Sequence, residues 1–431
     1  MLTDVFCTRQ RFLVTYLPRA RRTVHHARVT PAPSPARTLL TGRVVTPTAV
    51  LPDGAVALEG ERIVFAGAAR DLPPGWQGTP AADGWTPGAT ILPGLVDVHC
   101  HGGAGGEVGP DPAATRAAAA HHLRHGTTSL VGSLVSADPA TLLAGTRTAA
   151  TLVAAGELVG VHLEGPFLSD ARRGAQRADA LTDVDTDLVA VLARAAADAG
   201  APQALAQMTF APERDPGSRL PAALATHGIL PAFGHTDADD TLVAAALRTA
   251  RETAPRGGRP LVTHVFNGMP PLHHRSPGPV AACLSAAARG EAVLEVVGDG
   301  VHLAPGTVRM LFDLVGAEGL CLVTDAMAAS GMPEGTYQLG GQEVRVEAGT
   351  ARLVDGGAIA GGVTTLLDVV RWCVHEVGVP LLEAVTAASA TPAEALALAG
   401  RGRLEAGARA DLVVVDDQLA SPRVMRCGAW L

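Results

Sequence analysis

The stretch Gly160–Gln176, GVHLEGPFLSDARRGAQ, carries the strongest indication of this chain's fold. The apolar run Leu158–Leu163 overlaps its beginning and has the length of a buried strand. The run ends at the carboxylate of Glu164, directly before Gly165 and Pro166. An unpaired buried carboxylate is very costly, so Glu164 requires a partner. A salt bridge, a strand-end cap and a functional ligand all satisfy that requirement, and this stretch alone does not choose between them.

Seven similar apolar runs lie between residues 90 and 400 and alternate with segments rich in alanine and leucine. With Leu158–Leu163, the expected strands are Leu95–Cys100, Ser129–Val135, Leu205–Phe210, Ile229–Gly234, Leu261–Phe266, Ala292–Val297 and Leu320–Thr324. Spacings of roughly 25 to 45 residues suit strand–helix units, and eight units predict an α/β fold with a closed parallel (β/α)8 TIM-type barrel. A doubly wound open sheet is the alternative, but no GxGxxG follows the first strand to support it.

The two flanks of this middle part have a different pattern. Short alternating strands, TLLTGRVVTP and GAVALEGERIVFAG, follow Thr38, and Asp53-Gly54 and Glu59-Gly60 are hairpin-type turn signals. The segment RGRLEAGARADLVVVDD near the other end has the same character. We therefore expect a small discontinuous β-sandwich domain built from residues 38–92 and 401–431, with the barrel at residues 93–400.

Residues 1–37 form a third type of segment. They contain seven arginines, the single acidic residue Asp4, and the closely spaced prolines Pro31, Pro33 and Pro35. We interpret them as a disordered basic extension. A start site placed too far upstream and a targeting peptide are the alternative explanations.

Composition excludes several classes of function. The formal net charge of -8 gives no support for nucleic-acid binding. No apolar run reaches the ~18 residues that a membrane helix requires. The six cysteines are scattered without a CxxC pair, which favours reduced thiols in a cytoplasmic protein over a disulfide framework or a cysteine zinc site.

Histidines and carboxylates gather at the expected strand ends, which share one mouth in a (β/α)8 barrel. They are His99, His101, Glu164, His235, His264, Asp299, His302 and Asp325. Any one histidine is more often a hydrogen-bonded structural residue than a ligand, but the joint placement predicts a metal centre. Imidazole and carboxylate suit Zn²⁺ or Fe²⁺, and two histidines with one glutamate and an open position form a hydrolytic zinc arrangement.

The chain contains no lysine: the 34 residues counted as lysine or arginine are all arginines. A carboxylated lysine therefore cannot bridge two metals in this protein. Glu164 is the strand-end carboxylate that is placed to replace it.

Six segments together indicate a family. GVHLEGPFLSDARRGA, FGHTDA, THVFNGMPPLHHR, GDGVHL, VTDAMAASG and GRLEAGARADLVVVD occur in this order and resemble the N-acetylglucosamine-6-phosphate deacetylases of the amidohydrolase superfamily. The resemblance runs from about Thr38 to Asp416. It implies hydrolysis of N-acetyl-D-glucosamine 6-phosphate to D-glucosamine 6-phosphate and acetate by a metal-activated water, in amino-sugar catabolism.

The resemblance also implies roles for single residues. Glu164, His235 and His264 match the family's metal ligands, Asp325 matches its general base and acid, and His302 matches a histidine at the reacting amide. The residues that match substrate contacts are Ala175, Gln176, Asn267, Gly268, Arg275, His302, Ile359 and Ala360. Two of these depart from the family pattern: Gln176 stands where histidine is usual, and Gly268 where alanine is common.

The implied cofactor is a divalent metal, Zn or Fe, with one or two ions per subunit. His99 and His101, which some family members lack, permit a second ion bridged through Glu164. An arginine at the position of Arg275 is thought to reach a neighbouring subunit's site in relatives, so a homodimer is implied. Three alternatives remain open: a deacetylase for N-acetylgalactosamine 6-phosphate, one for an unphosphorylated N-acetyl sugar, and a non-catalytic scaffold.

Overall fold

The computed structural model describes residues 36–79 and 89–431. The extension expected at residues 1–37 lies outside the described residues, except for Ala36 and Arg37. Arg37 is the first residue of a strand.

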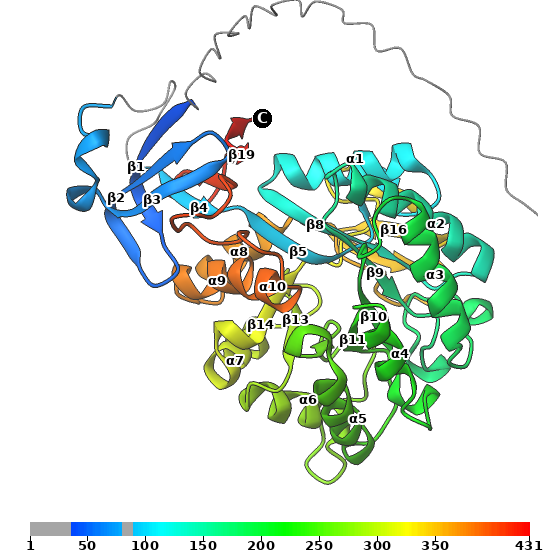
Figure 1. Cartoon of the computed structure of the whole chain (residues 1–431). Helices are drawn as coiled ribbons and strands as arrows, with labels where there is room; N and C mark the ends of the chain where they lie inside the picture. The colour runs from blue at the N-terminus through cyan, green and yellow to red at the C-terminus, as the bar shows by residue number, and fades with distance from the viewer. Residues whose placement is uncertain (1–35, 80–88) are drawn as a thin grey trace, which may run out of the picture. The chain divides into compact units, whose positions relative to one another are not determined.

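A seven-stranded sheet combines strands from both flanks of the chain, in the order β20-β19-β18-β4-β1-β2-β3. Its strands are β1 (Arg37–Val45), β2 (Val50–Glu59), β3 (Arg62–Ala68), β4 (Thr90–Pro93), β18 (Leu412–Val415), β19 (Arg423–Arg426) and β20 (Ala429–Trp430). β4 joins the two flanks, because it pairs in parallel with β1 and antiparallel with β18. Figure 1 shows the red C-terminal strands in the same part of the molecule as the blue strands of the other flank. The expected second domain from both chain ends is confirmed.

One of the two predicted turns in this domain is correct. β2 ends at Glu59, and Gly60 takes the left-handed φ of 57° that a tight turn into β3 needs. The turn predicted at Asp53-Gly54 is wrong, because both residues lie inside β2. A Cβ on Gly54 would lie 2.6 Å from Cγ2 of Val44, so this glycine allows close strand packing instead of a turn.

The middle of the chain forms the predicted barrel. Its eight strands are β5 (Leu95–Cys100), β8 (Thr127–Leu134), β9 (Gly160–Glu164), β10 (Leu205–Phe210), β11 (Leu230–Phe233), β12 (Leu261–Val262), β13 (Val293–Val297) and β14 (Leu320–Val323). They pair in parallel in chain order. A parallel bridge from Cys100 to Ala326 and a hydrogen bond of 2.9 Å from Asp325 N to His99 O connect the last strand to the first.

Ten helices lie in the described residues, and most of them surround the barrel strands (Figure 1). They are α1 (Pro112–Arg124), α2 (Pro139–Ala154), α3 (Thr186–Asp198), α4 (Leu220–Thr226), α5 (Asp240–Thr253), α6 (Gly278–Ala288), α7 (Pro305–Val315), α8 (Leu366–His375), α9 (Leu381–Ala387) and α10 (Ala390–Ala395). An aspartate side chain caps the first turn of α1, α2, α3 and α5, namely Asp111, Asp138, Asp185 and Asp239. Such caps satisfy backbone N–H groups that the helix itself cannot.

The sequence analysis did not predict a three-stranded antiparallel sheet after β14. It consists of β15 (Gly335–Leu339), β16 (Gln342–Glu347) and β17 (Thr350–Leu353). Its apolar side chains, such as Leu339 and Val344, pack with Met327 and Ala360 in a separate buried cluster. This sheet therefore supports the loops that follow β14 at the mouth of the barrel. Two further short strands, β6 (Gly102–Gly103) and β7 (Gly106–Glu107), form a small hairpin after β5.

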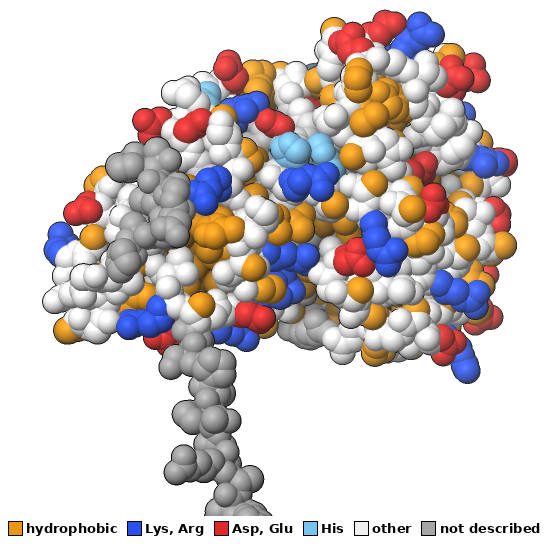
Figure 2. Space-filling view, turned by 90° about the horizontal axis from the view of Figure 1, so that it is seen from above, with side chains coloured by type: hydrophobic (Ala, Val, Ile, Leu, Met, Phe, Trp, Pro, Cys, Tyr) orange, Lys and Arg blue, Asp and Glu red, His pale blue; other side chains and the backbone are white. Residues whose placement is uncertain are grey.

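The state of the described cysteines and the hydropathy of the described helices can be read from the structure. Cys100, Cys283, Cys321, Cys373 and Cys427 are all free thiols. Among the described helices, none combines the length and the hydropathy of a membrane span. On the face drawn in Figure 2, acidic and basic side chains are interspersed instead of forming one basic surface.

Candidate active site

Glu164 lies at the end of β9 and is only 3% exposed. Its Oε1 is 3.0 Å from Nε2 of His235 and 3.0 Å from Nε2 of His264, and these two nitrogens are 3.0 Å apart. Ligand atoms that each lie about 2.0–2.2 Å from one cation come similarly close to one another. Two imidazoles and a carboxylate are also ligands that Zn²⁺ and Fe²⁺ accept. The geometry and chemistry of this set therefore fit a divalent metal.

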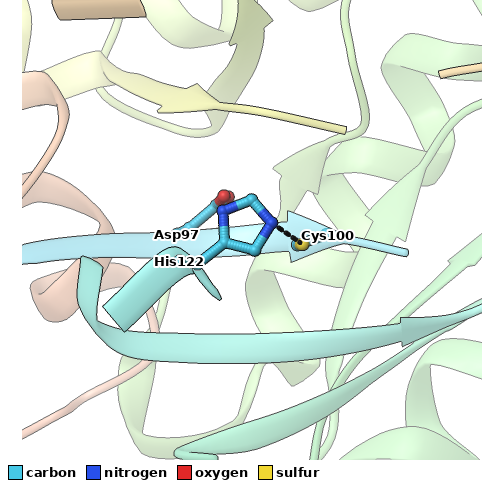
Figure 3. Close-up of side chains that lie close together, drawn as sticks. All are labelled: Asp97, Cys100 and His122. Atoms are coloured by element: carbon cyan, nitrogen blue, oxygen red, sulfur yellow. Dashed lines mark hydrogen bonds between the residues drawn. The ribbon is translucent and has the colours of Figure 1, made fainter. Parts of the chain in front are cut away.

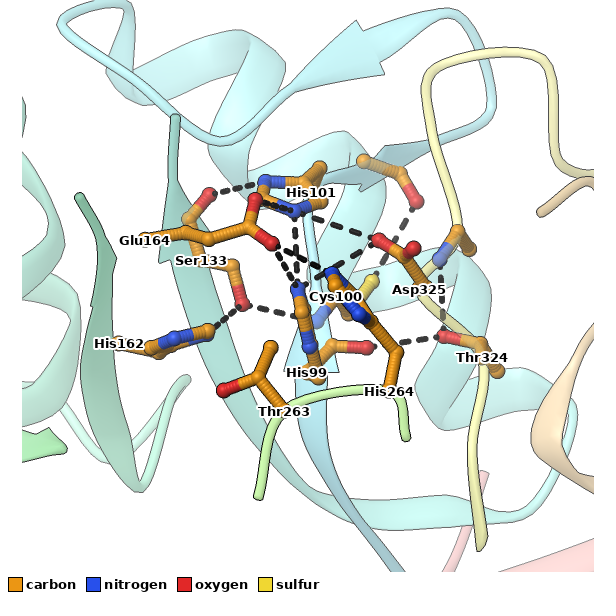
Figure 4. Close-up of polar contacts among 12 residues, drawn as sticks. His99, Cys100, His101, Ser133, His162, Glu164, Thr263, His264, Thr324 and Asp325 are labelled. Carbon is orange, nitrogen blue, oxygen red and sulfur yellow. Dashed lines mark hydrogen bonds and ion pairs between the residues drawn. The ribbon is translucent and has the colours of Figure 1, made fainter. Parts of the chain in front are cut away.

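A second set of donors shares the same carboxylate (Figure 4). Nε2 of His101 is 3.1 Å from Glu164 Oε2 and 3.0 Å from Nε2 of His99. Nε2 of His99 is 3.6 Å from Glu164 Oε1. Glu164 thus lies between two pairs of histidines, so both oxygens of its carboxylate face candidate ligands.

Asp325 approaches this cluster from the loop after β14. Its Oδ1 is 3.3 Å from Nε2 of His101 and 3.5 Å from Nε2 of His99. Burial raises the pKa of Asp325, but the charges of His99 and His101 and a hydrogen bond from His101 hold it below its ordinary value. Burial likewise raises the pKa of Glu164, and hydrogen bonds from His101, His235 and His264 hold it well below its usual range. The surroundings of both carboxylates therefore favour the ionised form, which a metal ligand and a general base require.

The local backbone that presents these side chains is unusual. His235, His264 and Asp325 each lie two residues after a strand end, and their φ angles are 48°, 29° and 46°. Non-glycine residues rarely adopt such left-handed conformations, and where they do, the strain often marks a functional site. The same geometry explains why β12 stops at Val262, although a strand through Phe266 was predicted.

Three of the four imidazoles in the cluster have a hydrogen-bond partner at Nδ1, on the side that faces away from Glu164. Nδ1 of His235 is 2.8 Å from the backbone oxygen of Arg172, and Nδ1 of His101 is 3.1 Å from the backbone oxygen of Ser133. Nδ1 of His99 is 2.8 Å from the carboxylate of Glu295. For Nδ1 of His264, no hydrogen-bond partner occurs among the described residues. Partners of this kind fix the ring orientation and the tautomer of metal-binding histidines.

A pocket of about 240 Å³ opens beside the cluster. Its lining includes His101, Glu164, His235, His264 and Asp325 from the cluster, and Ala175, Gln176, Asn267, Gly268, His302 and Ile359 from the expected substrate contacts. The structure thus brings most of the predicted site residues to one place. Val135, Gly174, Leu339, Ala358 and Gly361 also line the pocket, and the sequence analysis missed them.

Two predicted substrate contacts lie outside this lining. Ala360 is fully buried, in the cluster that also contains side chains of the β15–β17 sheet. Arg275 is exposed on the loop between β12 and α6, where its Nη1 is 2.8 Å from Nε2 of His274.

Gln176 interacts with the candidate ligand Glu164 as well as facing the pocket. Its amide nitrogen donates to Glu164 Oε2 at 2.5 Å, and its amide oxygen accepts from Ser136 N at 2.8 Å. Gln176 is 6% exposed. A neutral amide can donate and accept at once but cannot carry charge. In this chain, Gln176 therefore also holds one oxygen of the central carboxylate.

His302 enters the pocket from the segment after β13. Its Nδ1 is 2.8 Å from Asp299 Oδ2, and its backbone N–H donates to Asp299 Oδ1 at 2.9 Å. Burial lowers the pKa of His302, but the hydrogen bond and charge of Asp299 outweigh it and raise the pKa above its ordinary value. Asp299 thereby fixes the ring of His302 at the pocket.

A different trio, Asp97, Cys100 and His122, lies close together outside the pocket (Figure 3). Burial raises the pKa of the Cys100 thiol well above its ordinary value, which disfavours the thiolate that binds metals. Nε2 of His122 is 2.9 Å from Gly102 O, and Asp97 accepts a hydrogen bond of 2.6 Å from the hydroxyl of Thr324. Through these contacts the trio connects α1 and β5 with the end of the last barrel strand, which explains the three residues as structural.

Comparison with known proteins identifies the family of this chain and agrees with the fold. The family model described as "Amidohydrolase family" matches residues 90–427. N-acetylglucosamine-6-phosphate deacetylase from Lysinibacillus sphaericus is 34% identical over 349 residues, which are 79% of this chain and 85% of that protein. N-acetylgalactosamine-6-phosphate deacetylase from Escherichia coli O157:H7 is 32% identical over 339 residues, which are 76% of this chain and 84% of that protein.

Solved structures give the same result. A variant of N-acetyl-D-glucosamine-6-phosphate deacetylase from Mycobacterium smegmatis, in complex with N-acetyl-D-glucosamine-6-phosphate, superposes with a TM-score of 0.83. It is 38% identical, and the match covers 92% of this chain and 99% of that chain. The histidine–carboxylate cluster at the mouth of the barrel and these matches lead to one conclusion: the chain belongs to the amidohydrolase family and is a metal-dependent hydrolase.

Proposed function

We propose that this protein hydrolyses N-acetyl-D-glucosamine 6-phosphate to D-glucosamine 6-phosphate and acetate, in amino-sugar catabolism. The observation that carries the proposal is the pocket in which Asp325 and His302 face the Glu164 cluster. The 38% identity to the Mycobacterium smegmatis enzyme, which was captured with this sugar phosphate, supports the choice of substrate.

The chemistry requires help because an acetamide is a poor electrophile. Glu164, His235 and His264 would hold a divalent metal, which would supply a more acidic water and a polarised carbonyl. In our proposal, Asp325 accepts a proton from the attacking water at a carboxylate oxygen and returns it to the departing amine nitrogen. His302, whose Nδ1 is bound to Asp299, presents its other ring nitrogen to the acetamide.

Sugar and phosphate recognition falls to the surrounding residues. We assign the sugar to Ala175, Gln176 and the loop that contains Ile359 and Ala360, and the phosphate to Asn267, Gly268 and Arg275. A guanidinium suits a phosphate because its planar set of donors matches the oxygens. Arg275 is exposed and lies outside the pocket of its own chain. This position supports a homodimer in which Arg275 completes the site of the second subunit.

Further parts of the proposal concern the metal, the domains and the location. We propose Zn or Fe, with one or two ions per subunit, His99 and His101 being ligands of the second. We assign the small β domain to residues 38–92 and 401–431 and the barrel to residues 93–400. The free thiols of the described cysteines support a cytoplasmic protein.

A second candidate is deacetylation of N-acetylgalactosamine 6-phosphate. Two observations favour it: the 32% identity to the Escherichia coli enzyme of that name, and the presence of Gln176 at a pocket position where histidine is usual.

Comparing kcat/KM on four sugars separates these candidates. We expect N-acetylglucosamine 6-phosphate to exceed its unphosphorylated form by at least about 100-fold, since charged hydrogen bonds contribute about 1.5–3 kcal/mol each. N-acetylgalactosamine 6-phosphate and N-acetylgalactosamine complete the set. A higher kcat/KM for the galactosamine phosphate would replace the first candidate with the second. A preference for an unphosphorylated sugar would reject the phosphate assignment.

Asp299→Asn should lower the pKa of His302 and reduce kcat/KM about 10- to 100-fold. The reason is the loss of one charged hydrogen bond, which contributes about 1.5–3 kcal/mol. Because Asp299 raises the pKa of His302, its neutralisation must shift the titration of His302 to lower pH. NMR titration of His302 and steady-state kinetics measure the two effects. An unchanged titration in the variant would show that Asp299 does not control this ring.

A further inference from the structure

Glu295 is a buried acid that the proposed reaction does not use. It lies in β13 with an exposed fraction of 0%. A charged carboxylate in such surroundings is expensive unless it is paired and hydrogen-bonded. Two side chains contact its carboxylate. Oε2 of Glu295 is 2.8 Å from Nδ1 of His99, and Oε1 accepts a hydrogen bond of 3.1 Å from Nε2 of Gln207.

These contacts define the direction in which His99 points. Nδ1 of His99 donates to Glu295, so its Nε2 is directed to the opposite side, toward Glu164, His101 and Asp325. Gln207 in turn keeps the carboxylate in place, because its amide nitrogen also donates to Val98 O at 2.9 Å. A carboxylate behind a histidine fixes the ring and raises the basicity of the nitrogen that binds a metal.

Among the imidazoles of the cluster, only His99 has a carboxylate behind it. His235 and His101 donate to backbone oxygens instead, and His264 has no such partner among the described residues. A neutral carbonyl polarises an imidazole ring less than an anion does. The donor set that contains His99 therefore includes a ring polarised by a carboxylate, and the set of His235 and His264 does not. A variant of Glu295 should therefore affect one set and leave the other unchanged.

We propose that Glu295 is the positioning residue that holds His99 as a metal ligand, so that His99, His101 and Glu164 form a binding set whose affinity depends on this buried acid. The inference rests on the proposed metal-dependent function and specifies which residue outside the ligands controls the second metal.

The test measures metal binding to the purified full-length protein in the absence of sugar. The metal-free protein is titrated with Zn²⁺ against a chelating competitor, and bound metal per chain is determined by elemental analysis. For Glu295→Gln we expect one metal at wild-type affinity and the other bound about 10- to 100-fold more weakly, the range typical for loss of such a partner. Adding Glu295→Gln to His99→Asn should weaken binding no further, because the acid acts through His99.

Asp215→Asn is a matched control. Asp215 is also a buried carboxylate, 4% exposed, but it accepts hydrogen bonds from Arg219 N and Leu220 N at the start of α4. The Asp215→Asn variant should bind both metals with wild-type affinity. If Glu295→Gln fails to fold, Glu295→Asp provides the same test, because it keeps the charge and withdraws the carboxylate from His99.

Two results would overturn the inference: wild-type affinity for every metal in the Glu295 variants, or an additional loss when Glu295→Gln is combined with His99→Asn. Failure of the proposed function is recognised separately. A protein that shows the predicted metal binding but deacetylates none of the four sugars rejects the function and leaves the role of Glu295 intact.

Discussion

Replacing Asp325 with asparagine should lower kcat about 10²- to 10⁴-fold and leave the metal content close to that of the wild type. Asparagine has nearly the same shape as aspartate, but its amide cannot accept and return a proton at neutral pH. Asp325 is placed for this transfer because its Oδ1 lies within 3.5 Å of His99 and His101 and the side chain lines the pocket. Steady-state kinetics and elemental analysis of the same preparation measure both quantities.

Metal content is the decisive control for this variant. If Asp325 acted mainly as a ligand, Asp325→Asn would lose metal and activity together, and adding metal would restore turnover. We expect no such rescue. A variant that retains most of the wild-type kcat would remove Asp325 from the mechanism.

Glu164→Gln should abolish both metal binding and turnover. Glu164 is the one residue shared by the two donor sets, so its loss affects every ion that the cluster could hold. Removing only an outer partner of a ligand already weakens metal affinity about 10- to 100-fold, and removing the ligand itself should exceed that range. The prediction is checked by counting metal per chain after dialysis and by measuring kcat/KM with and without added Zn²⁺ or Fe²⁺.

Gln176→Ala is the appropriate comparison, because Gln176 touches the same carboxylate without belonging to either donor set. As an outer partner of the ligand, Gln176 should matter less: Gln176→Ala should weaken metal binding by at most about 10- to 100-fold, whereas Glu164→Gln should abolish it. If Glu164→Gln bound metal as well as the wild type does, the carboxylate would be a structural acid that the histidines neutralise, and the assignment of the centre would have to change.

The barrel was predictable because each strand is an apolar run that ends near a polar residue. Leu95–Cys100 and Leu205–Phe210 have the expected bounds. The expectation for Leu261–Phe266 was too long, since alternation of residue types contains no information about the left-handed backbone at His264 and Phe266. Strand bounds near the mouth are therefore set by the geometry of the site as well as by hydrophobicity.

The missed sheet β15–β17 shows a different limit. Gly340-Gly341 and the alternation of Val344 and Val346 are typical of a hairpin, although this hairpin lies outside the alternating strand–helix units of the barrel. Glu295 could not have been found in this way. Its partner His99 is 196 residues away in the sequence, and only closure of the barrel brings the two side chains together.

The sheet that contains strands from both flanks has a consequence for biosynthesis. During translation, β4 can pair with β1 as soon as both strands have left the ribosome. The other edge of β4 stays unpaired until β18, Leu412–Val415, has been made. An open strand edge is a template for incorrect pairing, and contacts between segments far apart in sequence form slowly. Leu92 and Val413 also belong to the same buried cluster as Leu95 of the first barrel strand. The newborn polypeptide therefore cannot complete the packing between this sheet and the barrel until the ribosome has made the chain as far as Val415.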